Sequence, residues 1–76
     1  MWKELDNKLI KKFVFKNFIE SVAFVTKISI ISEKFDHHPE IHVMYDKVTI
    51  TLSTHELGNI VSEKDHALSK EIDNLV

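Results

Sequence analysis

The segment from Phe18 to Phe35 constrains the fold of this 76-residue chain more than any other, because it is long, apolar and free of glycine and proline. Asn17 followed by Glu20 is a variant of the capping box that starts helices, so we predict a helix from about Phe18 to Lys34 or Phe35. Its apolar side chains cover an arc wider than the stripe of about 100° on an ordinary surface helix. One side of this helix can therefore cover a sheet, and we expect the remaining apolar side to meet another subunit.

Alternating residues before this helix predict a β-hairpin. We place two strands at Trp2–Asn7 and Leu9–Phe15, around a tight turn at Asp6-Asn7-Lys8, because Asn and Asp tolerate left-handed backbone conformations. In the second strand, the apolar residues Ile10, Phe13 and Phe15 contrast with Lys11, Lys12 and Lys16, with one exception at Val14. Such a pattern is typical of a strand with one buried and one solvated face.

Two more strands are predicted after the helix. Pro39 ends any helix and favours an extended conformation at His38. A short strand follows at Ile41–Tyr45, and then a two-residue turn at Asp46-Lys47. From Val48 to Ser53, aliphatic residues alternate strictly with Thr or Ser, which indicates a half-buried strand.

A second helix is predicted at the end of the chain. Leu57–Val61 forms a loop, and Ser62 with Asp65 three residues later is a capping-box variant that opens a helix from Glu63 to about Leu75. The element order is then β-β-α-β-β-α. This order predicts an α+β fold in which a four-stranded antiparallel sheet carries the helices on one face. We expect residues 1–76 to form a single domain.

The small size of the chain and its lack of cysteine indicate self-association. A chain of this length buries only about 60% of the surface that it exposes when unfolded, and its core rarely contributes more than about 3–5 kcal/mol. Without cysteine, no disulfide and no thiolate zinc site can add to this stability. Assembly as a dimer or a tetramer is the remaining common source.

Charge and hydropathy exclude two classes of partner. The net charge is −2, with ten lysines and no arginine, so the chain lacks the basic stripe and the guanidinium groups that nucleic-acid-binding proteins use. The longest apolar stretch, Phe18–Ile31, is interrupted by Glu20 and Lys27 and is too short to span a bilayer. The N-terminus has no apolar signal region. We therefore expect a cytoplasmic protein that binds neither nucleic acids nor membranes directly.

Histidines gather where the chain is expected to turn. His37 and His38 precede the only proline, and His55 follows the last predicted strand. Histidine exchanges protons near neutral pH and is also a common metal ligand. Adjacent histidines in extended backbone point to opposite faces, and neither predicted helix carries two histidines at the i, i+4 spacing of zinc helices. The pattern therefore favours general acid–base chemistry over a metal site.

Acid–base catalysis needs one group that accepts a proton and another that donates one, and groups with a pKa near the working pH do this best. We expect His37 and His38 to reach the two sides of a flat substrate and His55 to approach from a neighbouring segment. The carboxylates that could orient an imidazole are Glu33, Glu40, Glu56 and Asp65.

Each single residue also has an ordinary structural explanation. A histidine in a turn or a strand is usually solvated, as we expect for His42 and His66. Capping of the last helix explains Asp65 as well as a functional role does. For His37, His38 and His55, only the wider sequence pattern around them favours a functional role over this structural explanation.

Several motifs extend this pattern over the chain from Trp2 onward. They are Phe13-x-Phe15-x-x-Phe18, Glu33-Lys34, Asp36-His37-His38-Pro39-Glu40, Tyr45-x-Lys47-Val48, Ile50-Thr51-Leu52-Ser53-Thr54-His55-Glu56, Ser62-Glu63-Lys64-Asp65 and Ala67. Together they resemble the pterin-4a-carbinolamine dehydratases, also known as the dimerisation cofactor family. The run from His37 to His55 is the most specific part, because it matches without gaps.

The resemblance implies a hydro-lyase that removes water from 4a-hydroxytetrahydrobiopterin, or a related pterin, and releases quinonoid dihydropterin for tetrahydrobiopterin recycling. The residues implied to be catalytic are His37, His38 and His55. Those implied to bind the substrate are the same histidines with Pro39, Thr54, Glu56 and Leu57. The acids implied to orient a histidine are Asp65 and Glu33. The resemblance implies neither a metal nor a cofactor.

The resemblance also bears on partners. Members of the family are tetramers built from dimers, which implies a homo-oligomer assembled through the long helix and a sheet edge. Some relatives stabilise a dimeric transcription factor through the same helix face. A non-enzymatic interaction module, with an exposed patch at Ile28, Ile30 and Ile31, is therefore a second hypothesis.

The chain departs from the family pattern in three places. Ile41 stands where the family commonly has Trp, which removes aromatic surface near the pterin. The loop Leu57–Val61 is one residue longer than usual, and the leading helix of the family is absent because the chain begins at the first strand. A member that binds pterin without turnover is therefore a third hypothesis.

Overall fold

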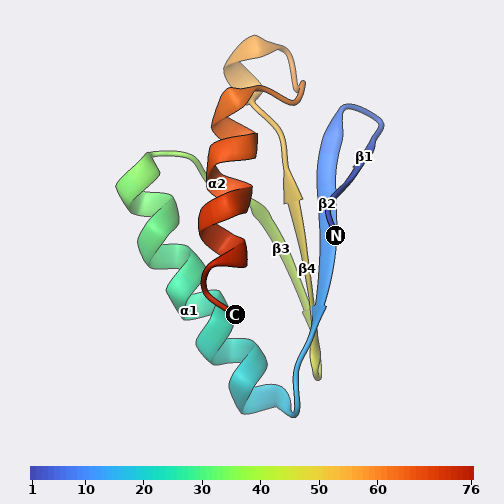
Figure 1. The fold of residues 1–76 in the computed structure, drawn as a ribbon, viewed down its shortest axis with the longest axis vertical. Coiled ribbons are helices and arrows are strands. Elements are labelled where there is room, and N and C mark those ends of the chain that lie inside the picture. Colours follow the sequence, from blue (N-terminus) through green and yellow to red (C-terminus); the bar gives the residue numbers. More distant parts are fainter.

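In the computed structural model, which describes residues 1–76, the chain forms a four-stranded antiparallel sheet with both helices on one face (Figure 1). The elements in chain order are β1 (Lys3–Leu5), β2 (Lys8–Val14), α1 (Phe18–Phe35), β3 (Glu40–Met44), β4 (Lys47–Leu52), the short 3₁₀ helix η1 (His55–Leu57) and α2 (Glu63–Asp73). The strand order is β1-β2-β4-β3, so β1 and β3 lie at the two edges. The predicted α+β fold is confirmed.

The two hairpin turns differ in how well their sequences predict them. Asp6 and Asn7 have φ angles of 53° and 62° and join β1 to β2 as predicted, because two-residue hairpins favour left-handed turn residues. The prediction of a turn at Asp46-Lys47 is wrong by one residue, since the turn residues are Tyr45 (φ 52°) and Asp46. Lys47 pairs with Met44 of β3 instead, because this register places the next side chain, that of Val48, in the core.

Local hydrogen bonds set both ends of α1. The Asn17 side chain accepts a hydrogen bond from the N–H of Glu20 at 2.9 Å, as predicted. The Glu20 carboxylate accepts one from the N–H of Lys16 at 2.9 Å, one residue earlier than in a capping box. At the other end, Asp36 is left-handed (φ 50°) and its N–H donates to the carbonyl of Glu33. Asp36 thereby turns the chain from the helix into the histidine segment.

The core lies between the sheet and the two helices. β4 turns Val48, Ile50 and Leu52 inward, and all three are fully buried, which confirms the predicted alternation of this strand. The other buried apolar side chains are Leu9, Phe13, Phe24, Ile28, Leu68 and Ile72. The ring centroids of Phe13 and Phe15 each lie 4.8 Å from that of Phe24, so α1 is packed on β2 through an aromatic cluster.

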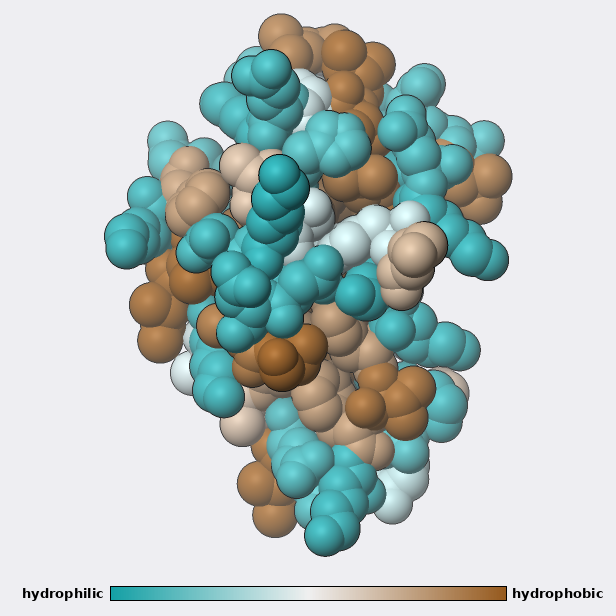
Figure 2. Space-filling view, in the orientation of Figure 1, coloured by the Kyte–Doolittle hydropathy of each residue, from teal (hydrophilic) through white to brown (hydrophobic).

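A second apolar side of α1 faces away from the sheet. Its exposed side chains are Phe18, Ile19, Val22 and Ile30. Figure 2 shows hydrophobic surface among hydrophilic side chains along the α1 side of the molecule. The predicted width of the apolar arc is therefore confirmed.

The residues on that side differ from those expected. Of Ile28, Ile30 and Ile31, only Ile30 is exposed, while Ile28 is fully buried and Ile31 is partly buried. Ile28 follows Phe24 by about one helical turn, so both side chains fall on the face that packs on the sheet. Neither helix has the length and apolar character needed to cross a membrane.

The last helix begins where predicted and ends early. α2 starts at Glu63 as expected but stops at Asp73, before the predicted end at Leu75. The Asp73 carboxylate accepts hydrogen bonds from the indole N–H of Trp2 at 3.1 Å and from the Lys11 ammonium at 2.8 Å. These contacts tie the end of α2 to the N-terminal hairpin.

Truncation of Ile28 tests this description of the core. Ile28→Ala should lower the free energy of unfolding by about 2–5 kcal/mol and Ile28→Val by about 0.5–1.5 kcal/mol, because each leaves a cavity between α1 and the sheet. Lys27→Ala, at an exposed position, is the control and should stay within about 0.5 kcal/mol of the parent. Urea denaturation followed by Trp2 fluorescence measures all three. Equal effects at the two positions would contradict the assignment of Ile28 to the core.

Candidate active site

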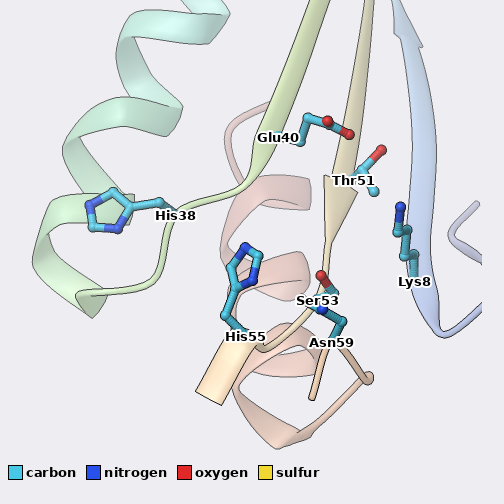
Figure 3. Close-up of a pocket in the computed structure, with 7 residues that line it drawn as sticks. All are labelled: Lys8, His38, Glu40, Thr51, Ser53, His55 and Asn59. Atoms are coloured by element: carbon cyan, nitrogen blue, oxygen red, sulfur yellow. The ribbon is translucent and has the colours of Figure 1, made fainter. Parts of the chain in front are cut away.

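A polar pocket of about 350 Å³ lies on the sheet face that the helices leave uncovered. Its lining contains no hydrophobic side chain and consists of Lys8, His38, Glu40, Thr51, Ser53, His55 and Asn59 (Figure 3). Small-molecule sites are usually lined mainly by apolar side chains with a few polar groups among them. The pocket therefore suits a ligand that carries several hydrogen-bonding groups.

Strand alternation directs side chains into this pocket. Because β4 turns every second residue into the core, Thr51 and Ser53 face the uncovered side of the sheet. Glu40 at the start of β3 pairs with Thr51, and Lys8 is the first residue of β2. The pocket thus spans three strands, or about 10 Å at the usual strand spacing of about 4.8 Å. The alternation of β4 could have identified Thr51 and Ser53 from sequence, but no motif points to Lys8 or Asn59.

His38 and His55 line the pocket from two connections that the fold brings together. The His38 ring points toward α1 and away from the other lining side chains (Figure 3). His38 lies between α1 and β3, and its Nε2 is 3.3 Å from Oε2 of Glu33, in the last turns of α1. His55 opens η1 just after β4, and its ring extends toward the middle of the pocket (Figure 3). Both histidines are exposed, so their imidazoles can exchange protons with solvent or with a ligand.

His37 has surroundings unlike those of its neighbour. Its residue is only 6% exposed, and its Nε2 lies 2.6 Å from Oδ1 of Asp65. Successive side chains of an extended segment point to opposite sides, so His37 turns toward α2 whereas His38 turns toward the end of α1. Within one chain, the two imidazoles therefore do not face a common cavity, and His37 lines no pocket.

Asp65 is fully buried, and its carboxylate accepts three hydrogen bonds. The donors are Nε2 of His37 at 2.6 Å, the Thr54 hydroxyl at 2.7 Å and the N–H of Ser62 at 2.9 Å. Burial pushes the pKa of the Asp65 carboxyl upward, but the donors outweigh it and hold this pKa below its ordinary value. The capping explanation and the contact with a site histidine therefore both hold, since one oxygen completes the capping box of α2 and the other binds His37.

The other residues expected to bind the substrate surround the Asp65 carboxylate and the end of α1. Thr54 is buried, and its hydroxyl also lies 2.6 Å from that of Ser62. Glu56 and Leu57 are exposed on η1, where they line a separate hollow of about 360 Å³ together with Thr54. Pro39 lines a third hollow, of about 210 Å³, beside the end of α1.

Ile41 lies on the opposite side of the sheet from the polar pocket. It pairs with Ile50, packs against the core and lines the hollow that also contains Pro39 and His38. His38 is thus the only residue that the polar pocket shares with the Pro39 hollow. The His, Asp and Glu side chains form no group of three that could hold a metal ion.

The comparisons with known proteins agree over nearly the whole chain. The family model described as Pterin 4 alpha carbinolamine dehydratase matches residues 1–75. A protein of Prochlorococcus marinus, provisionally named pterin-4-alpha-carbinolamine dehydratase, is 51% identical over 72 residues, which are 95% of this chain and 74% of the relative. A protein of Sulfolobus acidocaldarius with the same provisional name is 50% identical over 74 residues, covering 97% of this chain and 80% of the relative.

Two solved structures share the fold. A crystal structure from Brucella melitensis, described as a transcriptional coactivator/pterin dehydratase, has a TM-score of 0.90 and 32% identity, and the match covers 96% of this chain and 79% of that one. A pterin dehydratase-like protein, described as a RuBisCO assembly factor in the alpha-carboxysome, has a TM-score of 0.82 and 30% identity, with coverage of 97% and 87%. The motifs, the fold and these matches agree, and the chain belongs to the pterin-4a-carbinolamine dehydratase family.

Proposed function

We propose that this protein is a dehydratase that eliminates water from 4a-hydroxytetrahydrobiopterin or a related pterin carbinolamine. The observation that carries the proposal is that His38 and His55, from different connections, line one pocket. Membership of the family supports the substrate class. The quinonoid dihydropterin released by this reaction is the form that is reduced again, so the activity belongs to pterin recycling.

The elimination consists of two proton transfers and one bond cleavage. The N5–H bond and the bond between C4a and its hydroxyl oxygen break, the C4a=N5 double bond forms, and the hydroxyl leaves as water once it gains a proton. The reaction changes no net oxidation state, so it calls for no redox cofactor. One imidazole accepts the N5 proton while the other donates to the leaving hydroxyl, which is work that imidazoles do well near neutral pH. Glu33 orients His38 for this task through their 3.3 Å contact.

His37 contributes by positioning the segment that carries His38 and Pro39. Its Nε2 is already bound to the buried Asp65 carboxylate, and it lies outside the pocket. Thr54, the residue before His55, donates to the same carboxylate. One buried acid therefore anchors the backbone on which both pocket histidines stand.

Replacement of His55 tests the proposed chemistry. His55→Ala should lower the turnover number by about 10²-fold or more, because the reaction loses one of its two proton-transfer groups. The assay follows the loss of absorbance of freshly generated 4a-hydroxytetrahydropterin. His66→Ala is the matched control, since His66 is exposed on α2 and outside the pocket. Full activity in His55→Ala would remove this role, and a parent rate no faster than buffer would overturn the proposed function.

Replacement of Asp65 tests the anchor through its pH dependence. Because the folded-state pKa of Asp65 is lowered, its carboxylate stabilises the fold above the unfolded pKa of about 3.9, and this stabilisation is lost as the pH falls through the folded pKa. Asp65→Asn should abolish that part of the acid dependence. It should also lower the free energy of unfolding at neutral pH by about 1.5–3 kcal/mol, the range for hydrogen bonds to charged groups.

Urea denaturation at acidic and neutral pH measures this effect. Thr54→Val removes one donor but keeps the carboxylate, so it should cost about 1 kcal/mol and retain the acid dependence. Glu71→Gln, at an exposed position on α2, is the control for loss of a carboxylate. A parent-like pH profile in Asp65→Asn would contradict the anchoring role.

Two surfaces support a homo-oligomer, dimeric or tetrameric. β3 is an edge strand, so its outward N–H and C=O groups are free to pair with another strand, and its Val43 and Met44 are exposed. The outer side of α1 exposes Val22 and Ile30. A second copy that covers these surfaces would bury apolar area that the small core of one chain leaves in water.

A charge on the outer side of α1 tests this assembly. Ile30→Glu should shift the protein toward the monomer, because a carboxylate buried in an apolar contact is strongly unfavourable. Lys70→Glu, which places the same side chain at an exposed position of α2, away from this side of α1, should leave the assembly unchanged. Sedimentation velocity measures both. A parent protein that is monomeric at micromolar concentration would contradict self-association.

An interaction role is the second candidate function. The names of the two solved relatives include a transcriptional coactivator and a RuBisCO assembly factor, and the exposed side of α1 could receive such a partner. The carbinolamine assay separates the candidates. Tight pterin binding without turnover would select a non-catalytic pterin-binding member, and absence of both would select the interaction role.

A further inference from the structure

We propose that Lys8 and Glu40 form a specificity subsite that recognises the amide edge of the pyrimidinone ring of the substrate, an inference that rests on the proposed function. Lys8 and Glu40 extend toward Thr51 from the two neighbouring strands of β4 (Figure 3). Glu40 pairs directly with Thr51. On β2 the partner of Thr51 is Ile10, and Lys8 lies two residues before it. The sheet thus brings a cation, a hydroxyl and a carboxylate to one end of the pocket.

The fold itself uses neither charge. None of the four ion pairs in the chain includes Lys8 or Glu40. Lys11 and Lys47, by contrast, each bind a carboxylate, at 2.8 and 2.9 Å. Both Lys8 and Glu40 are exposed, and they line the same pocket as the two histidines. Their donor and acceptor groups are therefore available to a ligand.

The chemistry of the subsite matches one edge of a pterin. A 2-amino-4-oxopyrimidine presents N–H donors at its 2-amino group and at N3, followed by an acceptor at its 4-oxo group. A carboxylate can accept both N–H groups, an ammonium donates to a carbonyl oxygen, and a hydroxyl does either. The order Glu40, Thr51, Lys8 across the sheet follows the order of the donors and the acceptor on the ring.

This orientation also brings the reacting carbon near the histidines. The carbon that bears the 4-oxo group is bonded to C4a, which carries the leaving hydroxyl. When Lys8 holds the 4-oxo oxygen, C4a lies only two bonds from the anchored atom, within the pocket that His38 and His55 line. Lys8 and Glu40 therefore orient the ring, and the proton transfers fall to the histidines.

Three stable oxidised pteridines test the subsite by fluorescence titration near neutral pH. Pterin carries the 2-amino-4-oxo edge. In 2,4-diaminopteridine a donor replaces the 4-oxo acceptor and N3 becomes an acceptor, and in lumazine an acceptor replaces the 2-amino donor. The parent protein should bind pterin about tenfold more tightly than either analogue, as expected for one charge-assisted hydrogen bond. Lys8→Met should lose part of the preference over 2,4-diaminopteridine but keep that over lumazine, and Glu40→Gln should lose the preference over lumazine.

The controls separate this subsite from a general effect of charge. Lys12 lies on the same face of β2 but outside the pocket, so Lys12→Met should keep both preferences. Glu71→Gln, on α2, should also keep them. Parent-like preferences in Lys8→Met and Glu40→Gln, or equal losses in the controls, would overturn the subsite.

The carbinolamine assay distinguishes this failure from failure of the proposed function. Turnover by the parent protein, together with unchanged preferences in the two variants, would remove the subsite and leave the dehydratase proposal intact. Turnover by a parent protein that shows no preference among the three pteridines would likewise remove the subsite and leave the dehydratase proposal intact. Absence of both turnover and pteridine binding in the parent would overturn both proposals.

Discussion

The buried carboxylate of Asp65 is the interaction on which the arrangement of the site depends. A buried charge is costly unless hydrogen bonds satisfy it, and here the donors come from three segments: His37 before β3, Thr54 after β4 and Ser62 at the start of α2. The hydrogen bonds that satisfy this one carboxylate therefore join the three segments. The cap of a helix, the burial of one histidine and the positions of two exposed histidines have a common physical cause.

The uncovered face of the sheet supplies the rest of the pocket. Both helices pack on the other face, where β4 buries Val48, Ile50 and Leu52. The intervening side chains of β4 are left to line a polar surface with residues of β2 and β3. The same alternation that builds the core thus builds the site. It also explains why every residue that lines the pocket has a polar side chain.

Local signals predicted most of the fold, and long-range contacts explain the failures. The caps at Asn17 and Ser62 depend on neighbours within four residues, so the sequence located the starts of both helices. The turn at Tyr45 has no such signal, because a left-handed tyrosine is selected by the strand register on either side of it. The burial of Ile28 likewise depends on which side of α1 meets the sheet.

For the site, the sequence by itself indicated the family and pointed to the three histidines, because they lie in a run that matches the family without gaps. It pointed less directly to Asp65, which follows a loop one residue longer than usual and also caps the last helix. Only the tertiary structure decided that His37 turns inward to Asp65 while His38 and His55 share a pocket. It alone also brought Lys8 to that pocket, since β2 and β4 pair across a long stretch of chain. The physical reason is that motifs record residues that are neighbours along the chain, whereas strand pairing and one buried carboxylate decide which of them meet.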